Sequence, residues 1–383
     1  MKRTLILFFA LSLLSACFSD NRIVETPEDG QNTEQVSENN NDDAKLPKKE
    51  RDPSVDSSDE EADEIRDQER SPSGRAIVRD SEEFGGFGLS NDLETDTSIH
   101  SVDLDDVLSG SQPKDGIPAL YDPEFETQDQ AREWLDDEGL GILYQDETEA
   151  RFYPYAILYF HEIVNDEVNN TPIAVTFCPL CGSALVFERT IDEKVERFGV
   201  SGKLWESNLL MYDLETESLW SQILGEAVVG EKTGALLTVL PADTLTFAEV
   251  KEYFPEAQIL SRETGYDRSY GASPYGDYET NDSLYFPVKG LGSSEAKAFP
   301  KKKLFVVSTA LPGKTLGFHR SDLLEEKEAE IKVDGETIEA KVLEDGTVQL
   351  RDVETDEFLP HFTTMWFSLF AHLGEEEAVV WSK

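Results

Sequence analysis

Short apolar or alternating runs, each closed by turn residues, recur from about Asp115 to the C-terminus. They include "GLGILYQ", "PIAVTF", "ALVFER", "LLMYDLE", "KLFVVST" and "TIEAKVLEDGTVQLRD". Runs of this length are typical of β-strands, because helices need longer stretches of 3.6-residue periodicity. The sequence therefore predicts a mainly β fold with a few short helices, in the β-rich α+β class.

Three stretches carry helix signals instead. They are "TQDQAREWLDDEG", which begins at Thr127, "TLTFAEVKEYFP", which has Thr246 as a candidate N-cap, and "TTMWFSLFAHLG" near the C-terminus. A threonine before an amphipathic run, with glycine or proline after it, is the usual signature of a short helix. We expect helices in these three places.

Two pairs of segments resemble each other. "GILYQDETEARFYPYAIL" (141–158) matches "VVSTALPGKTLGFHRSDL" (306–323) in pattern, and "YDLETESLW" (212–220) matches "RDVETDEFL" (351–359). We infer two related β units from internal duplication, 116–290 and 291–383, the second without the cysteines and the histidine of the first. Chance similarity among short acidic strands is the alternative.

The region 17–115 has a different composition. "QNTEQVSENNNDDAKLPKKERDPSVDSSDEEADEIRDQER" has almost no apolar side chain to bury. Such a segment does not offset its ordering entropy, so 17–115 is predicted to be an acidic disordered tether. The less polar part, 76–108, is expected to dock locally.

The N-terminus resembles a bacterial lipoprotein signal. Lys2 and Arg3 precede an apolar run from Leu5 to Leu14 that is too short to span a bilayer, so 1–16 reads as a signal peptide. "LSAC" matches the lipobox, which implies acylation of Cys17 and anchoring to a lipid bilayer. We expect a cell-envelope protein, held on the outside of the inner membrane or on the outer membrane. An ordinary signal with a stray cysteine is the alternative.

The chain has 79 acidic and 34 basic residues, a formal net charge of −45. Such a charge repels nucleic acid, so no nucleic-acid partner is expected. Much of the charge lies in the part expected to fold, which suggests adaptation to saline surroundings, where screening relieves self-repulsion.

The stretch "HEIVNDEVNNTPIAVTFCPLCGSALVFER" (161–189) holds two of the three cysteines. Asn169–Asn170 suits a two-residue hairpin turn, because asparagine tolerates positive φ. In that register Val164 faces Val175 and His161 faces Cys178, with Cβ atoms about 4.5–5.5 Å apart. Pro179 and Gly182 would bend Cys181 back toward the same place.

Cys178, Cys181 and His161 would then form a soft-metal site for Cu or Zn, with Met211 as a conceivable fourth ligand. Two other interpretations remain open. The cysteines would form a thiol–disulfide centre, with His161 lowering a thiol pKa, or a structural disulfide. With Cys17 acylated, they are each other's only intrachain disulfide partners, and the envelope is oxidising.

A second candidate feature follows the cysteines. Aromatic and amide side chains are interspersed between positions 205 and 222 and would line a ligand pocket. They are Trp205, Asn208, Tyr212, Trp220 and Gln222. A strand core with satisfied polar groups explains the same pattern. The later "TGYDRSYGASPYGDYETNDSLYFP" predicts a long ordered loop that either rims a pocket or packs on its own domain.

The segments "YPYAILYFHEIVND", "VTFCPLCGSALVF", "FGVSGKLWESNLLMYD" and "SLWSQILGEAVVG" resemble the uncharacterised prokaryotic family called domain of unknown function 3179. The resemblance covers nearly all of 116–372. It implies that His161, Cys178 and Cys181 belong to the family signature, and it implies no particular reaction.

Three functions are therefore compatible with the sequence. The first is an envelope lipoprotein whose His/Cys-x-x-Cys centre binds a soft metal for metal handling or redox. The second is a thiol–disulfide oxidoreductase, and the third is a non-enzymatic ligand-binding or scaffold protein with a structural disulfide. The sequence leaves open whether the protein is an enzyme.

The saline hypothesis makes a direct prediction. The midpoint of thermal unfolding is expected to rise as NaCl is added, because screening reduces repulsion among the carboxylates. Calorimetry over a series of salt concentrations measures this midpoint. A midpoint that falls with added salt contradicts the hypothesis.

Overall fold

The structure, a computed structural model, describes residues 69–79, 92–271, 273–294, 296–373 and 378–383. All of them belong to the unit Ser58–Lys383. Strands hold 40% of the described residues and helices 12%, which confirms the mainly β class with a few short helices. The predicted signal peptide and Cys17 lie outside the described residues. In the part of the chain that the structure describes, no helix has the length and apolarity needed to cross a membrane.

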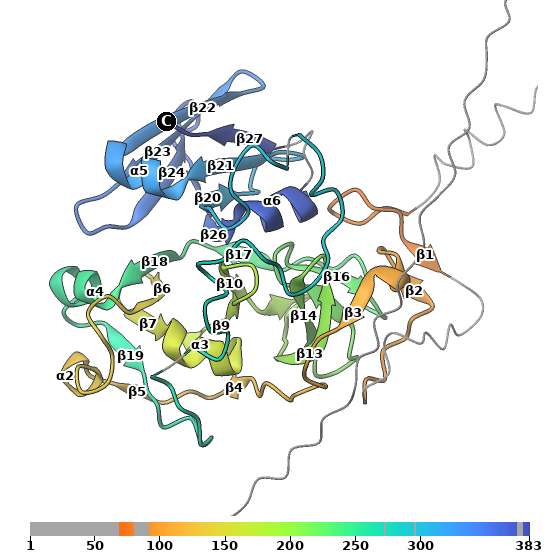
Figure 1. Cartoon of the computed structure of the whole chain (residues 1–383), viewed down its shortest axis with the longest axis horizontal. Coiled ribbons are helices and arrows are strands. Elements are labelled where there is room, and N and C mark those ends of the chain that lie inside the picture. The colour runs from red at the N-terminus through yellow and green to blue at the C-terminus, as the bar shows by residue number, and fades with distance from the viewer. Residues whose placement is uncertain (1–68, 80–91, 272, 295, 374–377) are drawn as a thin grey trace, which may run out of the picture. The chain divides into compact units, whose positions relative to one another are not determined.

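One antiparallel sheet of seven strands is built around the meander β13–β14–β15 (Figure 1). Its order is β1-β2-β16-β15-β14-β13-β3. The strands are β1 (Val78–Arg79), β2 (Ile99–His100), β3 (Val107–Ser109), β13 (Phe198–Trp205), β14 (Asn208–Asp213), β15 (Leu219–Ser221) and β16 (Glu226–Val229), and a 3₁₀ turn, η2 (Leu104–Asp106), precedes β3. Gly199 faces Tyr212 across the sheet, and a Cβ at position 199 would lie 2.4 Å from the tyrosine ring. Glycine is needed there because the ring covers the strand.

Strands β1, β2 and β3 fall inside 17–115, the predicted disordered tether. Within the described residues of that segment, the buried apolar side chains lie in 76–108, the less polar part that was expected to dock locally. Ile77, Val102 and Val107 are buried, and Val102 and Val107 pack in one hydrophobic cluster with Trp205 of β13. This burial offsets the ordering entropy that the polar residues alone do not offset.

A second sheet of nine strands holds the cysteine stretch. Its order is β27-β21-β20-β26-β10-β9-β8-β4, and β17 also pairs with β10. The strands are β4 (Leu120–Tyr121), β8 (Ile163–Val168), β9 (Thr171–Cys178), β10 (Ser183–Glu188), β17 (Thr238–Leu240), β20 (Leu304–Ser308), β21 (Thr315–His319), β26 (Phe362–Met365) and β27 (Ala378–Trp381). Because β10 pairs with β26, the units proposed as 116–290 and 291–383 share one sheet.

Three smaller sheets complete the β structure. The five-stranded one, β18-β6-β7-β19-β5, contains β5 (Phe125–Glu126), β6 (Leu140–Gln145), β7 (Ala150–Pro154), β18 (Asp243–Thr246) and β19 (Gln258–Leu260). The four-stranded one runs in chain order through β22 (Glu328–Val333), β23 (Glu336–Val342), β24 (Val348–Asp352) and β25 (Phe358–Leu359). The last pair is β11 (Thr190–Ile191) and β12 (Lys194–Val195).

The described residues form five short α-helices: α2 (Gln128–Ala131), α3 (Tyr155–His161), α4 (Phe247–Tyr253), α5 (Arg320–Glu326) and α6 (Trp366–Leu373). Thr127 and Thr246 are N-caps in capping boxes, as their sequence signals predicted. Helix α2 is a single turn, shorter than its pattern indicated. Helices α3 and α5 were not predicted, because each follows a strand without a capping side chain.

The same arrangement of elements occurs twice. Strand β7 leads into α3, β18 pairs with β6, and β19 runs parallel to β7. Strand β21 likewise leads into α5, β26 pairs with β20, and β27 runs parallel to β21. The tight turns that begin at Asp213 and Asp352 are also alike, since each carboxylate accepts hydrogen bonds from backbone N–H groups of its own turn. This repeated topology supports the inferred duplication.

Strand β9 is buried on both faces. Ala174 and Cys178 belong to the hydrophobic cluster that includes Phe198 and Met211 of the seven-stranded sheet. Val175 and Phe177 belong to a different cluster, which includes Ile157 and Leu158 of α3. Because side chains alternate along a strand, the two faces of β9 meet different surroundings.

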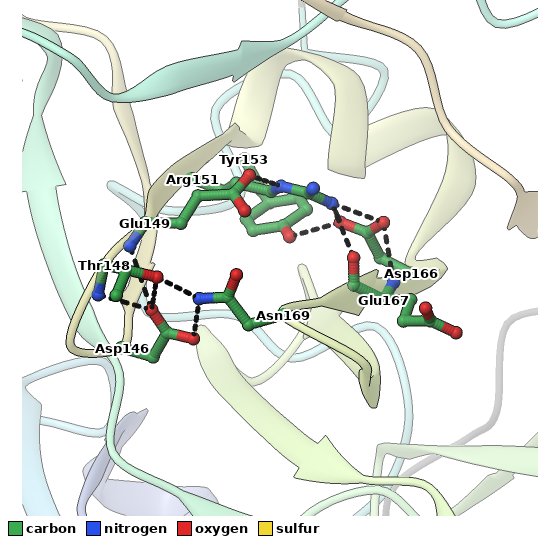
Figure 2. Close-up of polar contacts among 8 residues, drawn as sticks. All are labelled: Asp146, Thr148, Glu149, Arg151, Tyr153, Asp166, Glu167 and Asn169. Atoms are coloured by element: carbon green, nitrogen blue, oxygen red, sulfur yellow. Dashed lines mark hydrogen bonds and ion pairs between the residues drawn. The ribbon is translucent and has the colours of Figure 1, made fainter.

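The turn of the β8–β9 hairpin forms at Asn169–Asn170, as predicted. Both residues have positive φ, at 48° and 63°, and Val164 pairs with Val175 as expected. The Asn169 amide donates to the Asp146 carboxylate at 2.5 Å, and Figure 2 shows this contact beside Thr148. The turn is therefore held both by its own conformation and by the β6–β7 connection.

Candidate functional site

The turn between β9 and β10 brings Cys178 and Cys181 together. The Cys181 N–H donates to the Cys178 carbonyl at 3.1 Å, and Gly182 takes the expected left-handed conformation with φ of 56°. Both cysteines are free thiols, with exposed fractions of 1% and 0%. The bend predicted from the Cys-Pro-Leu-Cys-Gly stretch is present, and it encloses both sulfurs in the protein.

A polar network lies beneath this turn. The Asn208 amide donates to Ser183 Oγ at 3.1 Å and to Gln222 Oε1 at 3.0 Å. Gln222 in turn donates to Thr176 Oγ1 at 3.0 Å. All four side chains are buried. A fully satisfied buried network is rigid, so it fixes the strands that carry the thiols.

The two thiols have unequal acidity. Burial, the hydrogen bond to Cys181 and the charge of Cys181 all raise the pKa of Cys178. Burial by itself also raises the pKa of Cys181, but hydrogen bonds from the Cys178 thiol and the Asn208 amide outweigh it and lower the pKa. Cys181 is therefore the more acidic of the two thiols, and while protonated it donates to the Ser207 carbonyl at 3.2 Å.

Glu162 is a third member of this site. It follows the last residue of α3, with φ of 55°; its N–H donates to the Leu158 carbonyl, and its carbonyl accepts from the Phe177 N–H at 2.8 Å. Burial raises the pKa of its carboxyl to about 7, against a hydrogen bond from Tyr275 that lowers it. Its negative charge contributes to the raised pKa of Cys178. A buried carboxyl that titrates near neutral pH within electrostatic reach of two thiols suits proton transfer.

Two tyrosines of the loop between β19 and β20 cover the site. Tyr275 donates to Glu162 Oε1 at 3.0 Å, and Tyr278 donates to the Leu180 carbonyl at 2.9 Å. No helix or strand is assigned to the described residues of this loop. The tyrosine-rich stretch thus packs on its own domain and closes the thiol site at the same time.

His161 does not face Cys178. Strand β8 begins at Ile163, so His161 ends α3, and the register that paired it with Cys178 is broken at Glu162. Its Nδ1 lies 2.8 Å from the Pro118 carbonyl and its Nε2 lies 2.7 Å from the Tyr270 hydroxyl. Burial lowers its pKa to about 4. The imidazole is therefore neutral at pH 7, donating to Pro118 and accepting from Tyr270, and both nitrogens are occupied.

The other residues singled out from the sequence lie in the core. Met211 belongs to the same hydrophobic cluster as the two cysteines. The proposed pocket residues Trp205, Tyr212 and Trp220 are buried; Tyr212 donates to Asp115, and Trp220 donates to Asp213. Asn208 and Gln222 belong to the network beneath the turn. Within the described ranges, no group of three or more His, Cys, Asp or Glu side chains is placed to hold a metal ion.

The family described as "Protein of unknown function (DUF3179)" matches residues 114–365. The chain belongs to the DUF3179 family. The DUF3179 match includes the thiol turn, Glu162 and both covering tyrosines, whereas β1, β2 and β3 precede it. No curated protein matches the chain, and no solved structure matches it.

Sequence reasoning missed that Glu162 lies buried near the two thiols. The sequence favoured its neighbour His161 instead, because histidine is a common metal ligand and the hairpin register, if continued past Ile163, pairs His161 with Cys178. A helix that ends in a left-handed residue leaves little trace when that residue is glutamate, since glycine is the usual choice there.

The raised pKa of Glu162 makes stability depend on pH. The folded protein keeps this proton up to about pH 7, whereas an ordinary glutamate releases it near 4.5. With respect to this group, the folded protein therefore has its full stability at pH values below 4.5. It loses free energy of unfolding as the pH rises from there to about 7, because only the unfolded chain releases this proton readily in that range. The free energy of unfolding of Glu162→Gln, relative to that of wild type, is expected to increase by about 2–3 kcal/mol between pH 5 and pH 8.

Urea unfolding of both proteins at the two pH values measures the difference. Glu167→Gln, which removes an exposed carboxylate of the strand that follows, β8, is the matched control and should show no such change. An equal effect of Glu162→Gln at both pH values would contradict the assignment.

Proposed function

We propose that Cys178 and Cys181 form a redox-active dithiol that exchanges with disulfides of a partner molecule. The observation that carries the proposal is a pair of buried free thiols on one tight turn, with the buried carboxyl of Glu162, whose pKa is about 7, within electrostatic reach of both. A structural disulfide does not require a carboxyl group that accepts protons near pH 7. A redox dithiol needs one, because its second thiol must lose a proton while buried.

The reaction begins at Cys181. Cys181 releases its proton, its thiolate attacks one sulfur of the partner disulfide, the partner S–S bond breaks, and the leaving thiolate takes up the proton that Cys181 released. The product is a mixed disulfide between the protein and the partner. The low pKa of Cys181 raises the fraction of thiolate that is ready to attack.

Glu162 acts in the second step. Its carboxylate takes the proton of Cys178, and the Cys178 thiolate attacks the sulfur of Cys181. The mixed disulfide breaks, the second partner sulfur leaves and receives the proton from Glu162, and a Cys178–Cys181 disulfide forms. Two electrons pass from the protein dithiol to the partner disulfide, and the reverse sequence oxidises a partner dithiol.

Access to the sulfurs requires movement of the covering loop. The hydrogen bonds from Tyr275 to Glu162 and from Tyr278 to Leu180 close the site. Breaking the Tyr275 bond removes an interaction that lowers the pKa of Glu162. Opening also ends the burial that is the larger cause of the raised pKa, so the pKa falls and the carboxylate is left able to accept a proton.

The proposal predicts a reversible dithiol–disulfide equilibrium. After equilibration in glutathione buffers, alkylation and mass spectrometry of the purified full chain should give a potential between about −120 and −270 mV, the range of catalytic centres. Glu162→Gln should slow oxidation by about a hundredfold at pH 7, whereas Glu167→Gln should not. Cys178→Ser should accumulate the mixed disulfide on Cys181.

Two results would overturn it. One is a potential below about −300 mV, which marks a structural bond and favours the scaffold interpretation. The other is an oxidation rate that Glu162→Gln leaves unchanged.

Metal binding by the thiols is a second candidate, favoured by the close coupling of two sulfurs in one buried place. Two thiolates suit Cu(I), and Met211 in the same cluster offers a thioether. Elemental analysis of the same protein tests this alternative. Stoichiometric Cu or Zn that is lost in Cys178→Ser supports it, and metal-free protein that takes up neither ion after reduction rejects it.

We further propose that acylated Cys17 anchors the protein to an envelope membrane. The support is the signal-like segment 1–16 with its lipobox. Two or three acyl chains give durable binding, at about 0.8 kcal/mol per buried methylene. The full chain should fractionate with membranes and Cys17→Ser should not, while equal partitioning of both would count against the anchor.

A further inference from the structure

A hollow with a volume of about 530 Å³ lies near the turn end of the β8–β9 hairpin. Three arginines line it, together with three carboxylates and a small apolar wall. The lining is Asp122, Pro123, Phe125, Arg151, Asp166, Glu167, Arg189, Val195 and Arg197. Three guanidinium groups in one place are unexpected in a chain with a formal net charge of −45.

The first of these arginines is neutralised by its neighbours. Arg151 donates to Glu149 at 2.7 Å and to Asp166 at 2.6 Å, and Figure 2 shows its guanidinium between these two carboxylates. Tyr153 also donates to Asp166, at 2.7 Å. The Arg151–Asp166 pair therefore forms a fixed wall of the hollow and leaves little charge to attract a ligand.

The second arginine carries an unpaired charge. Arg189 is 8% exposed, and its guanidinium donates to the backbone carbonyls of Asp166, Ile173 and Glu196. Two of its five N–H groups remain without an acceptor in these contacts. Burial and the nearby charge of Arg197 lower its pKa, against weaker attraction from the surrounding carboxylates. Because no carboxylate in the described part of the chain forms an ion pair with this buried cation, it is expected to recruit an anion.

The third arginine, Arg197, is free to move toward a bound anion. No hydrogen bond or ion pair joins the guanidinium of Arg197 to any other described residue, and its side chain is exposed. Its charge lies close enough to Arg189 to lower the pKa of that group. Two neighbouring guanidinium groups repel each other until an anion lies between them.

We propose that this hollow binds a small organic anion, whose carboxylate or phosphate group bridges Arg189 and Arg197. Planar guanidinium groups match both kinds of oxyanion with paired hydrogen bonds. The apolar part of the ligand packs against Phe125, Pro123 and Val195, of which Val195 is 49% exposed. The volume suits a small molecule rather than a single ion.

This site is separate from the thiols. Arg189 donates to the carbonyl of Ile173 near the start of β9, and Cys178 ends that strand. Five residues of extended chain span about 17 Å. Binding in the hollow therefore does not depend on the redox proposal, and each stands or fails by its own test.

The test is a titration of the full chain with four probes at constant chloride concentration, followed by calorimetry. Benzoate and phenylphosphonate join an apolar ring to a planar or a tetrahedral oxyanion, and acetate and phosphate lack the ring. We expect saturable binding of benzoate or phenylphosphonate, tighter than that of its ring-free counterpart. The probe that binds identifies the oxyanion as a carboxylate or a phosphate.

Arg197→Gln is the decisive variant, because the exposed guanidinium forms no hydrogen bond or ion pair with the described residues. It should weaken binding by about tenfold or more, and Arg197→Lys should recover part of the loss. Arg132→Gln removes an exposed arginine of similar charge outside the hollow and should change nothing. Absence of saturable binding by all four probes, or equal binding by wild type and Arg197→Gln, would overturn the proposal.

Discussion

The backbone at Glu162 is the constraint on which the thiol site depends. A single residue with φ of 55° ends α3 and turns the chain into β8. Its N–H closes the helix on Leu158, and its carbonyl accepts the Phe177 N–H of β9, so the helix end and the hairpin register are fixed together. One consequence is that His161 points to Pro118 and Tyr270. The other is that the Glu162 carboxyl is buried within electrostatic reach of both cysteines.

The second half of the chain has the same helix-to-hairpin junction without the cysteines. Lys327 has φ of 69° and follows α5; its N–H donates to the Leu323 carbonyl, and its carbonyl accepts the Val342 N–H. The hairpin that follows turns at Asp334–Gly335, where both residues have positive φ, as Asn169–Asn170 do. A lysine thus takes the place of Glu162, and the loop after β23 has no cysteines. The helix-to-hairpin junction belongs to the shared fold, while the dithiol and its carboxyl are particular to the first unit.

The thiol turn is held differently on its two sides. On the core side, the Asn208 and Gln222 amides form a closed network with Ser183 and Thr176, and the whole set is buried. On the other side lie Tyr275 and Tyr278, carried by a loop without regular structure in its described residues. In the proposed thiol exchange, the partner approaches from the side of this loop, because the other side is closed by strands.

The sequence by itself determined the features that depend on neighbouring residues. It predicted the β class, the N-caps at Thr127 and Thr246, the Asn169–Asn170 turn with its register, and the bend that ends in Gly182, because strand alternation, capping and positive φ are local properties. Only the tertiary structure decided which way His161 points, how acidic Glu162 is, and that strands from 69–115 complete a sheet. Those outcomes depend on burial and on contacts between distant segments, such as Tyr275 on Glu162 and β26 on β10. No local pattern records them, because a side chain's pKa and partners are set by what the rest of the chain packs around it.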